Sequence, residues 1–438
     1  AWRPAVDSVF RAVDRTDAPG CALGVVQRGE LVYARGYGLA SLEHRVPITP
    51  QTAFYIASTS KQFTAAAVAL LALDGKLDLD GSIRRWIPEL PGWADSITVR
   101  HLVHHTSGVR DYLSLWRLSG RTFNDAVPLE GALGLIARQR ATNFPPGTRH
   151  LYSNSGYLLL AVLVERVTGR SLNRFAAEKF FQPAGMINTR FRDDAALPIP
   201  DRADGHVWSE GRWQVFRTSF DLVGDGGLVT TVEDLARWER WFWLDPARAQ
   251  LRARVLARGR ITSGDSLTYA FGLTHGNLQG LRTVSHGGSF LGFLAEVLRV
   301  PERQTSIIAL CNTVAGSPVL RAREAAQVVL GLERQLAAPG TAPNQPIRHF
   351  TPDSALLRSV TGRYFSEELD VVYTIAGDSG QVRLTAGALR GRLVPEARDT
   401  FRLQNLQLAF TRDRPQRVTG LILSEGRAQG IRFIRLPR

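Results

Sequence analysis

The chain alternates between two hydrophobic spacings, one of two residues and one of three to four. Short apolar segments on either side of a turn are typical of β-strands, and at 21–38 they predict two strands around the turn Gln27–Glu30. Strand patterns return at 281–285, 290–299 and 305–312. The sequence therefore predicts an antiparallel sheet that is closed by strands from both ends of this region.

Between these strands, hydrophobic residues recur at helical spacing, which predicts a mainly helical insertion. One helix follows the segment Phe54–Ser60 and ends near Gly75. Further helices are predicted at 124–140, 155–168, 232–243 and 317–333. The predicted fold class is α/β (α+β), an antiparallel sheet with an inserted helical region.

A second domain is predicted at the C-terminus. Residues 337–346 are rich in Pro, Ala and Gly without periodicity, which is typical of a linker. Short segments of alternating hydrophobicity follow, and they predict a small all-β barrel or sandwich. We therefore predict domains at 1–336 and 347–438.

Composition excludes several classes of protein. The 438 residues are 44% hydrophobic and 21% charged, and no apolar run is long enough for a transmembrane segment. The net charge of +14 comes almost entirely from dispersed arginines, without the basic clusters of a nucleic-acid groove. The only lysines are Lys61, Lys76 and Lys179. We expect no nucleic-acid partner.

Two cysteines, Cys21 and Cys311, are too few for a disulfide framework or a thiolate metal site. The chain begins at Ala1 with neither a methionine nor a signal-like segment, as it would after removal of an export signal or after trimming. We expect neither a metal nor an organic cofactor.

Ser58-Thr-Ser-Lys61 lies where a short apolar segment becomes a helix. A serine there is by default an N-cap. Alternatively, Ser58 is a nucleophile and Lys61, one helical turn later, is its base, which requires an uncharged amine. A lysine in a chain that nearly always has arginine favours the second interpretation.

Three other motifs have both a structural and a functional interpretation. Tyr152-Ser-Asn154 precedes a predicted helix and is either a cap or part of a site. His286-Gly287-Gly288-Ser289 is expected to open the strand that begins at Phe290, either as a turn or as an edge that binds a substrate main chain. His101 and His105 have helical spacing, but no carboxylate motif accompanies them, so a structural role is favoured over a metal site.

Taken together, these motifs resemble the serine β-lactamase and penicillin-binding protein-like superfamily, specifically the branch of class C β-lactamases, D-Ala-D-Ala carboxypeptidases, D-aminopeptidases and related esterases (peptidase S12-like). The order is SxxK near 60, HTSG near 105, YxN near 150, a glycine-rich segment from Gly224, and HGG near 286. The resemblance covers about residues 5–335. It implies a β-lactamase/transpeptidase-like catalytic domain, followed here by a lipocalin-like barrel.

The resemblance also implies a role for each matching residue. Ser58 would form an acyl-enzyme, Lys61 would be its base, and Tyr152 would relay the proton. Asn154 would bind the substrate amide, and the N–H groups of Ser58 and Ser289 would form the oxyanion hole. His105 and the loop at Asp225 would be scaffold.

The third motif departs from the Lys-Thr-Gly of many β-lactamases, because His286 replaces the lysine and Gly287 the hydroxyl residue. A histidine is only partly charged near neutral pH, so the departure favours peptidases and esterases. The resemblance implies a small-molecule or peptide substrate, such as a D-residue peptide from the cell wall. The alternatives are a family VIII-like carboxylesterase, a class C-like β-lactamase, or a catalytically silent cell-wall-binding or scaffold protein.

Two further expectations come from the resemblance. It places Cys21 and Cys311 on neighbouring strands, where we expect a close but unbonded pair. It also implies a periplasmic or secreted bacterial protein.

Overall fold

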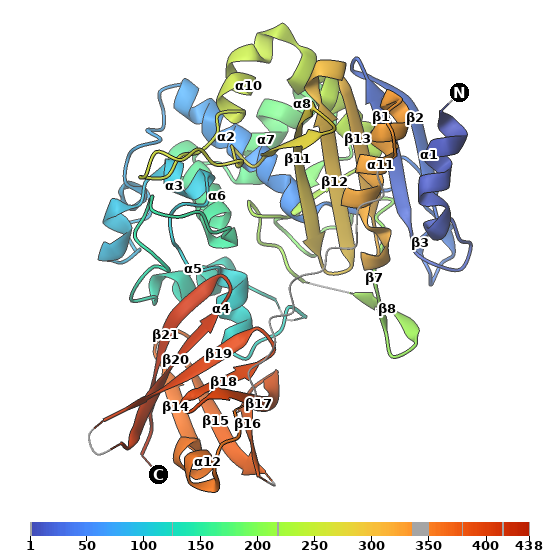
Figure 1. Cartoon of the computed structure of the whole chain (residues 1–438). Coiled ribbons are helices and arrows are strands. Elements are labelled where there is room, and N and C mark those ends of the chain that lie inside the picture. Colours follow the sequence, from blue (N-terminus) through green and yellow to red (C-terminus); the bar gives the residue numbers. More distant parts are fainter. Residues whose placement is uncertain are drawn as a thin grey trace. The chain divides into compact units, whose positions relative to one another are not determined.

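The computed structural model describes residues 2–124, 126–216, 219–334, 350–378, 380–413 and 416–437 (Figure 1). By contacts the chain forms two compact units. The first comprises Ala1–Gly81, Thr98–His104 and Tyr157–Pro339, and the second Ser82–Ile97, His105–Gly156 and Gly340–Arg438. The predicted linker 337–346 lies outside the described residues, and the domain boundaries at 336 and 347 stay a prediction.

A six-stranded antiparallel sheet, in the order β10-β11-β12-β13-β1-β2, forms the centre of the first unit (Figure 1). Its strands are β1 Cys21–Gln27, β2 Glu30–Tyr37, β10 Thr274–Leu278, β11 Leu281–Phe290, β12 Phe293–Val300 and β13 Thr305–Cys311. Strand β1 pairs with β13 along its whole length. The predicted closure of the sheet by strands from both ends of this region is confirmed.

Helices cover both faces of this sheet. Helices α1, Arg3–Phe10, and α11, Pro318–Leu330, pack together and share a core with β1 and β13 (Figure 1). Helix α9, Val232–Trp238, packs on the other face, so closely that a Cβ on Gly24 of β1 would lie 2.5 Å from Val232. The unit is therefore a three-layer sandwich.

Further helices and strands complete the first unit. The other helices are α2 Lys61–Leu73, α3 Val99–Val103, α6 Asn154–Thr168, whose first turn belongs to the second unit, α7 Leu172–Ala176, α8 Gln182–Ala184 and α10 Ala249–Val255. The remaining strands are β3 Leu39–Ser41, β4 Val46–Pro47, β5 Phe54–Tyr55, β6 Arg190–Phe191, β7 Gly205–Ser209, β8 Arg212–Phe216 and β9 Leu228–Thr230. None of the helices in the described ranges has the length and apolar character needed to cross a membrane.

Strand β11 is longer than predicted, since it runs through the His286–Ser289 motif instead of ending before it. The turn falls at Leu291 and Gly292, whose φ angles of 50° and 83° form a two-residue hairpin. The expectation that the motif opens the next strand was therefore wrong. Neither glycine of the motif has a positive φ; both are needed because a Cβ at either position would collide with neighbouring atoms.

The two cysteines are close, as expected, but they are bonded. Cys21 and Cys311 are directly opposite each other on β1 and β13 and form a disulfide. The expectation of an unbonded pair was wrong. Side-chain separation on paired strands suits such a bond, and a sequence of two cysteines does not reveal it.

The second unit contains a closed eight-stranded barrel that confirms the predicted C-terminal β-domain (Figure 1). Its strands are β14 Gly362–Ser366, β15 Val371–Asp378, β16 Gln381–Ala386, β17 Leu389–Ala397, β18 Thr400–Leu403, β19 Leu406–Arg412, β20 Val418–Glu425 and β21 Ala428–Arg435. β14 pairs with both β15 and β21, so the barrel has no open edge. Helix α12, Ser354–Val360, precedes it.

Residues 105–156 belong to the same unit and attach firmly to the barrel. They include α4, Tyr112–Leu118, and α5, Leu129–Ala137, which begins later than the predicted 124 because Pro128, at its N-cap, is extended. Arg110 and Glu368 form an ion pair in which each side chain is only 3% exposed. Tyr373 of the barrel donates a hydrogen bond to the Leu118 carbonyl at 2.7 Å.

We predict that the unfolded, unreduced protein has no free thiol and that reduction releases both Cys21 and Cys311, measured by thiol titration in denaturant. A variant with both cysteines changed to alanine should unfold with a free energy lower by about 2–5 kcal/mol, because the crosslink constrains the unfolded chain. Reduced wild-type protein is the control. Two thiols before reduction would contradict the bond.

Candidate active site

The turn that carries Ser58 is held in place by neighbouring strands. Strand β5 pairs with β9, and Ala57 then turns the chain with a left-handed φ of 46° into the 3₁₀ segment Ala57–Ser60. Ser60 Oγ donates to the Ala57 carbonyl and accepts from the Leu228 N–H at 3.2 Å. These contacts fix the backbone on both sides of Ser58.

Lys61, the first residue of α2, lies within hydrogen-bonding distance of Ser58. Its side chain is fully buried, and Nζ lies 3.1 Å from Ser58 Oγ. Nζ also donates to the Asp225 carbonyl and lies 5.5 Å from the centre of the Tyr157 ring. Neither the 3₁₀ segment nor α2 is capped by a side chain, so the cap interpretation of Ser58 does not hold.

The His286–Ser289 motif packs directly against this turn. Thr59 Oγ1 donates to the His286 carbonyl at 3.1 Å, and a Cβ on Gly288 would lie 2.1 Å from the Ile56 carbonyl oxygen. A Cβ on Gly287 would meet the Glu296 carboxylate at 2.9 Å on the opposite face. The structure thus brings Ser58, Lys61 and this motif together within one unit.

Strand β11 offers an edge at the same place. Strand β10 pairs with β11 only as far as Thr274 opposite Ser285, so in the described residues the motif has a strand neighbour on the β12 side alone. Ser289 is exposed there. An unpaired edge with an exposed residue can bind an extended main chain.

His286 is held in its uncharged form. Burial is the main reason that its pKa is lowered to about 4. Nδ1 lies 2.7 Å from the Gly287 carbonyl, so it carries the proton, and Nε2 accepts from the Tyr269 hydroxyl at 3.0 Å. The motif therefore lacks the permanent cation that a lysine would supply here.

Tyr152 and Asn154 belong to the second unit. The Tyr152 ring packs on His105 with ring centres 4.2 Å apart, and His105 Nδ1 accepts from the Ser153 N–H at 3.1 Å. The Asn154 N–H donates to Asp111 Oδ2 at 2.7 Å, and the same carboxylate caps α4. His105 and Asp111 therefore fix the start of α6.

The histidines near 105 have structural roles. His101 Nδ1 accepts from the Thr98 N–H at 3.2 Å and completes a capping box at α3. In the described part of the chain, no group of histidine, cysteine and acidic residues is arranged to hold a metal ion.

Arg427 is a residue of this region that the sequence did not reveal. Its guanidinium carbon lies 4.7 Å from the centre of the Tyr152 ring, within the range of a cation–π interaction. Its carbonyl accepts from the Asp111 N–H at 3.1 Å and from Asn143 Nδ2 at 2.9 Å. Arg427 lies in the turn between β20 and β21, far from every motif, so no sequence signal could have found it.

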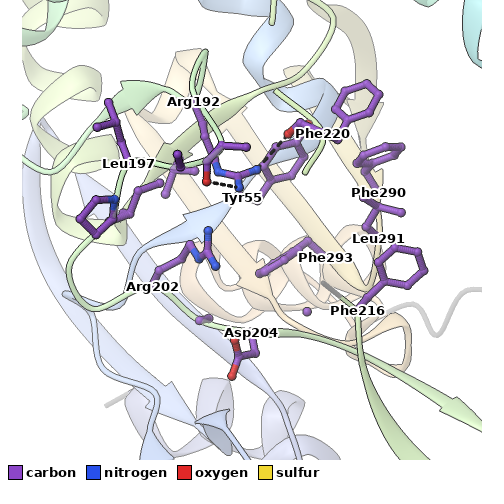
Figure 2. A pocket seen from close by; sticks show the side chains of 17 residues that line it. Tyr55, Arg192, Leu197, Arg202, Asp204, Phe216, Phe220, Phe290, Leu291 and Phe293 are labelled. Carbon is purple, nitrogen blue, oxygen red and sulfur yellow. Dashed lines mark hydrogen bonds between the residues drawn. The ribbon is translucent and has the colours of Figure 1, made fainter. Parts of the chain in front are cut away.

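A pocket of about 520 Å³, with an aromatic wall and the charged residues Arg192, Arg202 and Asp204 in its lining, lies at the end of β11 (Figure 2). Its aromatic wall consists of Tyr55, Phe216, Phe220, Phe290 and Phe293. Figure 2 shows the Arg192 guanidinium hydrogen-bonded to backbone carbonyls, at 2.9 Å for Phe220. Since Phe290 follows Ser289 directly, the pocket adjoins the third motif.

The chain is similar to known proteins over most of its length. A family model described as Beta-lactamase matches residues 6–330. A D-aminopeptidase of Cereibacter sphaeroides is 32% identical over 323 residues, which cover 71% of this chain and 61% of the relative. This chain therefore spans less than two thirds of that enzyme's length.

Two further similarities include the C-terminal part. Penicillin-binding protein 4* of Bacillus subtilis is 26% identical over 403 residues, 87% of each chain. The octameric penicillin-binding protein homologue from Pyrococcus abyssi superposes with a TM-score of 0.67 at 24% identity, with 99% of both chains covered. This last similarity shows that the fold is shared over the whole chain.

We predict that His286 makes the free energy of unfolding of the protein depend on pH. Its pKa is about 4 in the folded protein and about 6.5 when unfolded, so its contribution is complete above pH 6.5 and is lost as the pH falls toward 4. The difference in unfolding free energy between wild type and His286→Gln should shrink by about 3 kcal/mol over this range. Denaturant titrations at several pH values measure it.

The matched control is His44→Gln, since His44 is exposed. Its difference from wild type is the reference for the effect of replacing a histidine at the surface. A difference for His286→Gln that does not change with pH would show that His286 is not held neutral.

Proposed function

Because the chain belongs to the β-lactamase family, we propose that it is a serine hydrolase that acts through an acyl-enzyme on peptides and amides of D-amino acids. The observation that carries this proposal is the buried Lys61 amine 3.1 Å from the Ser58 hydroxyl. A free amine at this distance can take the proton from serine and make it a nucleophile. Burial favours the free amine over the ammonium ion.

In this proposal Ser58 attacks the carbonyl carbon while Lys61 accepts its proton. Tyr152 passes that proton to the leaving group and then helps water to attack the acyl-enzyme. The N–H groups of Ser58 and Ser289 stabilise the oxyanion, with about 3 kcal/mol for each donor. Asn154 binds the substrate amide; it lies three residues before Tyr157 on α6, and residues at this spacing project from one side of a helix.

Two observations support a D-aminoacyl amide over a β-lactam. A neutral His286 offers no permanent charge to the carboxylate that β-lactams carry. The similar Cereibacter enzyme is named a D-aminopeptidase. We propose further that the aromatic pocket at Phe290 takes a large apolar side chain, since burying such a group is favourable.

We also propose a cellular location for the protein and a role for the barrel. A disulfide between Cys21 and Cys311 supports a periplasmic or secreted protein, because such bonds persist in those compartments.

Arg427 links the barrel to the reaction, because a cation beside the Tyr152 ring favours the tyrosinate that accepts protons. In this proposal Arg427 is a positioning residue that acts through Tyr152.

We expect an acylating active-site probe to add one covalent label to the wild type and none to Ser58→Ala, measured by intact-mass spectrometry. Lys61→Arg should lower turnover at least a hundredfold, because a guanidinium stays protonated. The control is Lys76→Arg, an exposed lysine outside the site. An unlabelled wild type would favour a silent binding protein, and near-normal Lys61→Arg activity would remove Lys61 as the base.

The substrate class is identified by measuring the turnover of a panel of substrates by the wild type and the same variants. D-Phenylalanine amide should be cleaved faster than D-alanine amide, short-chain esters and a chromogenic cephalosporin. If Ser58 is labelled but the ester or the lactam is the fastest substrate, the alternatives of an esterase or a β-lactamase replace the peptidase.

Arg427→Ala should lower turnover about tenfold and move the rise of rate with pH to higher pH, because the tyrosinate loses a neighbouring cation. Arg427→Lys should restore part of the rate. Arg390→Ala, at an exposed position of the barrel, is the control. Point variants are preferred to deleting the barrel, since deletion would remove Glu368, the buried ion-pair partner of Arg110. An unchanged pH profile would refute the role of Arg427.

A further inference from the structure

A second pocket, of about 240 Å³, lies at another part of the first unit. It is formed by the turn after β1, the π-helical segment Glu239–Leu244, the end of α10 and the connection from β12 to β13. π-Helical turns are rare and are frequent at functional sites. Pro301 and Gln304, which also line the pocket, are exposed, so a small molecule can enter from solvent.

Hydrogen-bond donors surround the one carboxylate, that of Glu239, in the described lining of this pocket. Arg299 is 2% exposed, and its Nε and Nη2 donate to both oxygens of Glu239. Ser306 Oγ donates to the same carboxylate at 2.7 Å, which leaves it little capacity for a cationic ligand. The pocket is therefore unsuited to an ammonium group.

Two buried donors on this wall have no acceptor among the residues that the structure describes. They are Arg299 Nη1 and Trp243 Nε1, and both residues line the pocket. The guanidinium carbon of Arg299 lies 4.6 Å from the Trp243 ring centre, so the two side chains that carry these donors are neighbours. A buried donor without an acceptor costs free energy, and a ligand with acceptor oxygens would recover it.

Charge and the apolar lining define the class of ligand. Arg252 adds a second guanidinium to the pocket, while Glu239 is the one acidic residue of its lining, so the lining carries a net positive charge. Val26, Leu244, Leu256 and Val300 supply apolar surface. We propose that this pocket binds a small organic monocarboxylate with an apolar body and no ammonium group.

Arg299 also connects the pocket to the turn that carries Ser58. Its Nη2 donates to Gln62 Oε1 at 2.8 Å, and Gln62 Nε2 donates to the Thr59 carbonyl at 3.0 Å. Gln62 follows Lys61 and Thr59 follows Ser58 in the chain. A ligand that fixes the Arg299 guanidinium therefore restrains the turn that carries Ser58.

The probe is 4-methylpentanoate, and its uncharged amide is the matched control. Calorimetric titrations on Ser58→Ala at constant ionic strength make the result independent of any catalytic activity. The acid should bind at least tenfold more tightly than the amide, because only the acid offers a charged acceptor to both donors. Equal affinities, or no binding of the acid at millimolar concentration, would overturn the proposal.

Trp243→Phe tests where the acid binds, because it removes the Nε1 donor and leaves an aromatic ring, although a smaller one, at this position. We expect it to weaken binding of the acid about tenfold, while Trp208→Phe, at a tryptophan that is 57% exposed, leaves the affinity unchanged. Unchanged affinity in Trp243→Phe would place the acid elsewhere. Hydrogen exchange of the amides from 58 to 62 should slow when the acid binds, and unchanged exchange would overturn the connection to the turn.

Discussion

The pairing of β1 with β13 is the contact on which the first unit depends. It joins residues 290 positions apart, and its seven paired positions place β1 beside strands that the chain adds only after the helical insertion. Strands β12 and β11 continue the sheet from β13, so their register places His286 against Thr59. The site in this unit thus results from long-range backbone pairing, and helical propensity alone would not assemble it.

Much of this architecture follows from hydrophobic spacing, because the central strands β1 and β13 are buried along almost their whole length. The prediction of where β11 ends was wrong, because a glycine can indicate either a turn or a close contact within a strand. Gly287 and Gly288 indicated the opening of a strand, but they lie inside β11. Glycine is required at both positions because backbone and side-chain atoms of other segments lie too close for a Cβ. Close approach by distant residues leaves no local pattern, and the same reason hid the bond between Cys21 and Cys311.

The candidate site divides in a similar way. The contact between Ser58 and Lys61 was predictable, since three residues make one helical turn and both groups are set by local sequence. The position of Arg427 beside Tyr152 was not, since it depends on how the barrel packs on residues 105–156. The catalytic roles remain proposals, and the resemblance to a family of serine hydrolases, rather than spacing, suggested them.

Ala57 shows how the chain keeps its reactive serine in one orientation. A left-handed φ costs an alanine about 1 kcal/mol, whereas glycine would adopt it freely but would lose more conformational entropy on folding. The two effects are similar in size, so alanine has little net effect on the stability of the fold. Alanine instead makes the backbone at this position stiffer. Its Cβ restricts the backbone angles of residue 57, and this restricts the directions in which the Ser58 N–H can point.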